Sequence, residues 1–254
     1  MIMSLRAKRS NPVSKRRLLP AGSQRHGSNW EEQMYILLIL ALIFAVLEAV
    51  AVSKSLQRLE YVAKPAVMVC LFLWLYFSTG LQGNALWFGV AILFSLAGDV
   101  LLMLAPDRLF LFGLIAFLFA HISYITGLRE DLAADSTWSL VLLVIIAINV
   151  SRLIRRITGA MRARGENKLV ILVVVYGTVI SVMLYTAMST MYDPAWKTNA
   201  ALFVSLGALL FWISDLILAW NKFVSPIKNG AVFNITTYHL GQIGLIAGVI
   251  SQFG

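Results

Sequence analysis

Long apolar runs separated by short polar gaps fill the chain from about residue 34 to its end. Most runs come close to the about 20 helical residues that cross the hydrocarbon of a bilayer, and the fifth is shorter. A single run can satisfy its backbone hydrogen bonds in lipid only as a helix. The pattern therefore predicts an all-α polytopic membrane protein, a bundle of eight transmembrane helices with antiparallel neighbours. The expected helices cover residues 34–52, 63–81, 86–104, 109–128, 137–151, 169–191, 198–220 and 232–252.

The composition supports this class. Hydrophobic residues make up 59% of the 254 residues and charged residues only 13%, about half the charged share of a soluble domain. The net charge of +9 lies mainly in the gaps and in residues 1–33, which favours contact with anionic lipid head groups over nucleic acid. Residues 1–33 contain no apolar segment of a cleavable signal peptide. Their composition predicts a basic, disordered tail, with an organelle transit peptide as the alternative. We expect residues 34–254 to be the transmembrane domain.

The basic residues of the gaps sort to one side of the predicted bundle. Even-numbered gaps contain only Arg129 and Lys197, whereas the odd-numbered gaps hold most of the others, and such asymmetry predicts that the odd-numbered gaps are cytoplasmic. The basic tail would then be on the other side, against its own preference, and a helix miscount is the alternative. The basic residues of the odd-numbered gaps are Lys54, Arg58, Lys64, Arg108, Arg152, Arg155, Arg156, Arg162, Arg164, Lys168, Lys222 and Lys228.

Two apolar runs each contain an aspartate in a similar setting. Asp99 lies in LFSLAGDVLLML and Asp215 lies in LFWISDLILAW. The match is short and needs a one-residue gap, so it indicates either an internal repeat or chance. An ionisable side chain inside a membrane segment is costly and is by default a candidate functional site. We therefore take these two acids as the candidate catalytic residues, with a purely structural hydrogen-bonding role as the alternative.

Other polar side chains of the runs gather toward the odd-numbered gaps, which predicts one polar cavity opening to that side. Lys64 is either a phosphate ligand or a cation that extends to the head groups. His121 and Tyr124 share a helix face deeper in the bundle and could instead join two helices. The candidate substrate-binding residues are Lys64, Glu48, His121, Tyr124, Tyr176, Tyr238 and Gln242.

The chain lacks the motifs of several chemistries. It contains no GxSxG, Walker A, GxGxxG or HExxH pattern, which argues against a serine hydrolase, a nucleotide-driven pump, a dinucleotide enzyme and a zinc protease. Its single cysteine, Cys70, provides no disulfide framework. We expect no metal and no cofactor.

Several stretches of the chain occur in a recognisable order. They are Lys64-Pro65, SLAGDVLLM around Asp99, FLFAHISY at 117–124, GALLFWISDLILAWNKF at 207–223 and YHLGQIGLI at 238–246. Together they resemble the YhhN-like family of eight-helix membrane proteins, whose animal members are lysoplasmalogenases. The resemblance covers roughly residues 36–250. The chain departs from it at position 239, where it has His and the family pattern favours an aromatic residue.

The resemblance implies hydrolysis of the vinyl ether of a lysoplasmalogen, which yields a fatty aldehyde and glycerophosphocholine or glycerophosphoethanolamine. It also implies that Asp99 and Asp215 are the catalytic pair. A vinyl ether is labile to acid, and its hydrolysis passes through an oxocarbenium ion, as glycoside hydrolysis does. Two carboxyl groups, one protonated and one ionised, suit this chemistry, and the sequence does not say which is which.

Two other classes of function fit the same pattern. A transporter of a small or lipidic solute would also need intramembrane charges and a cavity, and a non-catalytic lipid-binding protein is a third possibility. The expected partners are a lysophospholipid and the bilayer, without nucleic acid; the oligomeric state is not readable from the sequence. We expect a bacterial inner membrane, or the endoplasmic reticulum if the source is eukaryotic.

Overall fold

A computed structural model describes residues 21–104, 108–129 and 136–254 of the chain. Over these residues all regular structure is helical, and Met34–Gly254 forms one compact unit. The predicted tail falls on residues 1–20, which lie outside the described residues, and on the start of the first helix. The helices are α1 (Ala21–Ser53), α2 (Gln57–Thr79), α3 (Ala85–Leu104), α4 (Phe110–Leu128), α5 (Thr137–Ala163), α6 (Val170–Ser189), α7 (Thr198–Phe223) and α8 (Gly230–Phe253).

The protein is an integral, multi-pass membrane protein built as a helical bundle. Seven helices, from α1 to α7, are long and apolar enough to cross a membrane. The remaining helix, α8, has 24 residues and is less apolar because it carries Tyr238, His239 and Gln242. These three side chains are buried inside the bundle, so α8 does not expose them to lipid.

Two predicted helix boundaries are wrong. Helix α2 begins at Gln57, ahead of the expected residue 63, so Pro65 lies inside the helix instead of in its first turn. Helix α5 continues to Ala163, well past the expected residue 151. Arg152, Arg155 and Arg162 therefore belong to a helix and not to a loop, and their exposed positions explain why apolar length alone missed this extension.

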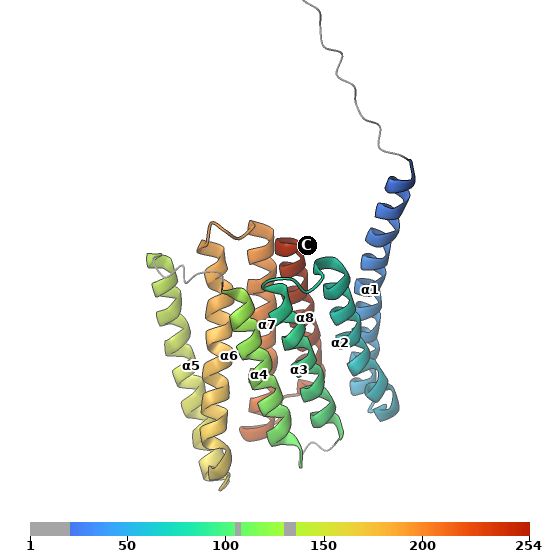
Figure 1. The fold of residues 1–254 in the computed structure, drawn as a ribbon. Helices are drawn as coiled ribbons and strands as arrows, with labels where there is room; N and C mark the ends of the chain where they lie inside the picture. Colours follow the sequence, from blue (N-terminus) through green and yellow to red (C-terminus); the bar gives the residue numbers. More distant parts are fainter. Residues whose placement is uncertain (1–20, 105–107, 130–135) are drawn as a thin grey trace, which may run out of the picture. The chain divides into compact units, whose positions relative to one another are not determined.

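The helices pack as hairpins. The most extensive contacts join α7 to α8 and α3 to α4, and α2 packs on both α3 and α8 (Figure 1). Helix α5 lies beside α6 and has the smallest buried share of the seven spans. The core of the unit therefore lies between the α3–α4 and α7–α8 hairpins, with α2 and α6 beside them.

Small residues bring α7 and α8 into backbone contact. A Cβ atom at Gly207 would lie 2.5 Å from the backbone nitrogen of Leu245 and 2.8 Å from the carbonyl oxygen of Gly241. Close backbone approach through small residues is a common way to pack helices in membranes. This contact fixes the spacing of the hairpin that carries Asp215 and Tyr238.

Replacing Gly207 is therefore expected to destabilise the protein. Gly207→Ala should lower the free energy of unfolding in detergent by about 1–3 kcal/mol, because the added methyl forces two backbones apart. Gly159→Ala is the matched control, since its Cβ would meet nothing within 4 Å on an exposed stretch of α5. Equal unfolding midpoints for the two variants would contradict the packing described here.

Candidate functional site

A polar cavity of about 360 Å³ lies at one end of the bundle. Residues from the end of α3 and α7 and from the start of α2, α4 and α8 line it, so it lies on the side of the odd-numbered connections. Both Asp99 and Asp215 line this cavity, and so do two lysines. Its polar lining residues are Glu60, Lys64, Asp99, Ser214, Asp215, Asn221, Lys222, Asn234 and Tyr238.

Asp99 is held by two neighbours. Its Oδ1 lies 3.3 Å from the Lys64 ammonium of α2 in an ion pair. Its Oδ2 accepts a hydrogen bond of 2.6 Å from the Tyr238 hydroxyl of α8. The Asp99 side chain is only 2% exposed, so its position depends on these partners and not on water.

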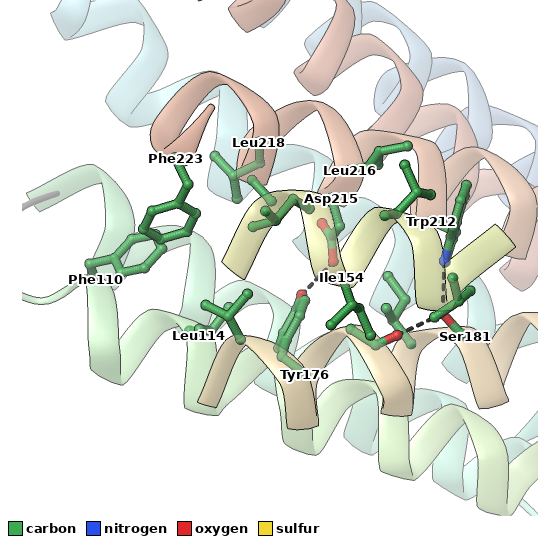
Figure 2. A pocket seen from close by; sticks show the side chains of 17 residues that line it. Phe110, Leu114, Ile154, Tyr176, Ser181, Trp212, Asp215, Leu216, Leu218 and Phe223 are labelled. Carbon is green, nitrogen blue, oxygen red and sulfur yellow. Dashed lines mark hydrogen bonds between the residues drawn. The ribbon is translucent and has the colours of Figure 1, made fainter. Parts of the chain in front are cut away.

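Asp215 has a different pair of neighbours. The Tyr176 hydroxyl of α6 donates a short hydrogen bond to its Oδ2 (Figure 2). The His121 Nε2 of α4 lies 3.3 Å from the same oxygen and 3.0 Å from the Tyr176 hydroxyl. The Asp215 side chain is 12% exposed, more than that of Asp99. The two acids thus share one cavity but not one environment.

A clamp between α7 and α8 holds the backbone next to Asp215. The Asn234 amide donates to both the carbonyl oxygen and the hydroxyl of Ser214, each at 2.8 Å. The Ser214 hydroxyl in turn donates to the Asn234 carbonyl at 2.9 Å. Three hydrogen bonds across one pair of helices limit the freedom of Asp215, the next residue along α7.

Each of the two aspartates contacts a side chain of the other helical hairpin. Asp99 of the α3–α4 hairpin contacts Tyr238 of the α7–α8 hairpin. Asp215 of the α7–α8 hairpin contacts His121 of the α3–α4 hairpin. Each hairpin therefore supplies an acid to the site and a partner for the acid of the other hairpin.

The structure places the predicted substrate-binding residues in two groups. Lys64 and Tyr238 line the cavity and contact Asp99, whereas Tyr176 and His121 contact Asp215. Tyr176 and His121 are not among the described residues that line this cavity. The other three predicted residues, Glu48, Tyr124 and Gln242, do not line it either and contact neither aspartate.

Two of those three residues join helices instead. The Tyr124 hydroxyl of α4 donates to Oε1 of Gln242, and the Gln242 amide donates to Ser95 Oγ of α3 at 3.0 Å. The three side chains are buried and link α3, α4 and α8. Their polar groups therefore bind one another inside the bundle. For Tyr124 this agrees with the alternative role, a hydrogen bond between two helices.

Glu48 forms a hydrogen bond with His239, the residue at which the chain departs from the family pattern. Its Oε2 forms a short hydrogen bond with the Nε2 of His239, and both side chains are at most 1% exposed. This pair connects α1 to α8 inside the compact unit. The structure therefore gives Glu48 and His239 a role in joining helices, outside the cavity.

Sequence reasoning missed several lining residues. Asn221 and Lys222 follow Asp215 by about two helical turns, and Ser214 precedes it directly. Their position near the odd-numbered connections could have indicated that they line the cavity. Because they also lie near a loop, exposure to solvent was the simpler explanation for their polar side chains. Over the residues that the structure describes, no three His, Cys, Asp or Glu side chains gather as metal ligands.

Comparisons with known proteins agree with the motif pattern. The YhhN family model matches residues 59–249. Lysoplasmalogenase TMEM86B of Sus scrofa is 29% identical over 176 residues, which cover 69% of this chain and 65% of that protein. Lysoplasmalogenase TMEM86B of Homo sapiens is 27% identical over 186 residues, which cover 70% of this chain and 69% of that protein.

A third relative shows the same level of similarity. Lysoplasmalogenase TMEM86A of Homo sapiens is 30% identical over 158 residues, which cover 61% of each chain. The chain therefore spans less than two thirds of the length of the Sus scrofa protein and of this one. No solved structure matches the chain.

Proposed function

This chain belongs to the YhhN family, and on that premise we propose that it hydrolyses the vinyl ether bond of lysoplasmalogens. The products are a fatty aldehyde and a glycerophospho-alcohol such as glycerophosphocholine or glycerophosphoethanolamine. The observation that carries the proposal is that Asp99 and Asp215 line one cavity together with Lys64 and Lys222. Relatives named lysoplasmalogenase supply the substrate class.

The reaction needs an acid and a carboxylate on the two sides of one bond. A carboxyl group donates its proton to the outer vinyl carbon, which leaves an oxocarbenium ion. The second carboxyl, as a carboxylate, stabilises this cation and takes a proton from the water that adds to it. The resulting hemiacetal breaks its carbon–oxygen bond and releases aldehyde and alcohol. Asp99 and Asp215 are the two groups of the cavity that fit these roles.

The lysines of the cavity suit the head group. The ammonium groups of Lys64 and Lys222 can bind the phosphate of a lysophospholipid as point charges. Tyr238, Tyr176 and His121 act as positioning residues, because each contacts a carboxylate oxygen and fixes its direction. The cavity thus combines two lysines that can bind an anion with two acids that can carry out the proton transfers.

A panel of lysolipids tests the proposal. Purified protein in detergent is given vinyl-ether, ester and alkyl-ether lysophosphatidylcholine and lysophosphatidylethanolamine, and aldehyde is measured. We expect aldehyde from the vinyl ethers alone. In D₂O the aldehyde should carry deuterium next to its carbonyl carbon, because the proton is added there. Release of fatty acid from the ester instead of aldehyde from the vinyl ethers would overturn the vinyl-ether assignment. Transport of solute into vesicles without turnover would overturn the hydrolase assignment.

We also infer that the odd-numbered connections face the cytoplasm, in a bacterial inner membrane, because they carry most of the loop lysines and arginines. Glu166→Cys between α5 and α6 tests this orientation. The native Cys70 is 8% exposed and reacts little. A membrane-impermeant thiol reagent is expected to label the variant only after cells are opened. Labelling of intact cells would reverse the orientation.

A further inference from the structure

An apolar groove starts beside Asp215 and runs between α5, α6 and α7 (Figure 2). Its volume is about 70 Å³. Ile154 of α5 and Leu216 of α7 contribute to its walls, and Gly177 of α6 leaves space between them. The hydrogen bond of 3.0 Å from Trp212 Nε1 to Ser181 Oγ satisfies the polar atoms at its inner end. The groove is therefore suited to a hydrocarbon and not to a polar ligand.

The groove borders the polar cavity. Phe110, Asp215 and Leu218 line both spaces, whereas Asp99 lines only the polar one among the described residues. Asp215 is therefore the acidic residue at the junction between a polar compartment and an apolar one. An amphipathic molecule with its head in the cavity would cross this junction where its head joins its chain.

We propose that this groove binds the first methylene groups of the alkenyl chain of the substrate, an inference that rests on the proposed function. Its volume of about 70 Å³ is small beside a long alkenyl chain, so it holds only the start of the chain. The remainder lies along α5, the least buried span, in contact with lipid.

This placement gives the two acids separate roles. The vinyl carbon that receives the proton is on the chain side of the ether oxygen. Asp215, at the junction with the groove, is therefore the acid that protonates it. Asp99, paired with Lys64 on the head-group side, is the carboxylate that stabilises the cation and accepts the proton of water.

A matched pair of glycine substitutions tests the groove. Gly177 lines it, and a Cβ atom there would lie 3.5 Å from Ile154, an ordinary contact. Gly177→Leu should therefore fold while its larger side chain fills the groove. Gly159→Leu is the control, on an exposed turn of α5 where a Cβ meets nothing within 4 Å. Both changes replace a helical glycine by a good helix former.

The measured quantity is the ratio of kcat/KM for a long-chain alkenyl lysophosphatidylcholine to kcat/KM for its prop-1-enyl counterpart. Gly177→Leu is expected to lower this ratio by about 10-fold or more, the effect of removing hydrocarbon contacts in a binding pocket. Gly159→Leu should keep the wild-type ratio. An unchanged ratio in Gly177→Leu, with wild-type protein active, overturns the groove assignment alone.

A second measurement separates this inference from the proposed function. A non-hydrolysable alkyl-ether lysophosphatidylcholine with a diazirine near its ether oxygen is crosslinked to the protein, and the labelled peptides are identified. Labelling of α5, α6 and α7 supports the groove even if wild-type protein releases no aldehyde, which would overturn only the hydrolase assignment. Labelling confined to α1 and α2 overturns the groove.

Discussion

Aldehyde release from a lysoplasmalogen is expected to fall by about 10²- to 10⁴-fold in Asp215→Asn and in Asp99→Asn, the range typical for loss of a general acid or base. Each substitution keeps the size of the side chain and a hydrogen-bond acceptor for its tyrosine partner, Tyr176 or Tyr238. It removes the ability to donate or accept the proton of the reaction. The measurement is kcat/KM for purified protein in detergent, at equal amounts of folded protein.

Asp193→Asn is the matched control for these variants. Asp193 lies in the connection between α6 and α7, at the other end of the bundle, and its Oδ1 accepts a hydrogen bond of 2.9 Å from the backbone nitrogen of Ala195. An asparagine keeps this bond, so activity should equal that of wild type. Wild-type activity in Asp99→Asn or Asp215→Asn would remove that residue from the mechanism, whatever the substrate panel shows.

The second large effect concerns stability. His239→Ala or Glu48→Ala is expected to lower the free energy of unfolding by about 3–5 kcal/mol, because each leaves a fully buried polar partner unpaired. Glu48 and His239 are each at most 1% exposed, so bulk water does not reach the group that is left behind. Unfolding in detergent, followed by circular dichroism, measures the loss.

A double replacement separates pairing from packing. Glu48→Leu combined with His239→Phe fills the same space with apolar atoms and leaves no orphaned group, so it should be much closer to wild type than either alanine variant. Catalytic activity per folded molecule should be retained, because the pair lies outside the cavity. A double variant less stable than the worse single variant would show that the pair does more than join α1 to α8.

The apolar pattern predicted the helices well because hydrocarbon thickness fixes the length of a span. It failed where a helix continues beyond the membrane. Residues Gln57–Val62 of α2 and the arginine-bearing end of α5 are mostly polar or exposed, and hydropathy cannot distinguish a solvated helix from a loop. It did identify α8, although the polar side chains of this helix, which are buried against protein, make the helix less apolar.

The site was predictable in part, for a similar reason. A carboxylate in an apolar run is conspicuous, so Asp99 and Asp215 stand out from the sequence alone. Which residue lies opposite each acid depends on how helices far apart in the chain rotate and meet. His121 lies nearer to Asp99 than to Asp215 in the sequence, yet it contacts Asp215. Glu48 was predicted to line the cavity because of its position along the first helix, but its side chain contacts His239 instead.

Each hairpin holds the acid of the other, and this exchange limits how the protein can move. A shift of α7–α8 against α3–α4 large enough to part Tyr238 from Asp99 would also part His121 from Asp215. Both acids would lose their alignment together, and turnover would stop. On the proposed function, a lipid that enters beside α5, the least buried span, leaves both of these contacts in place.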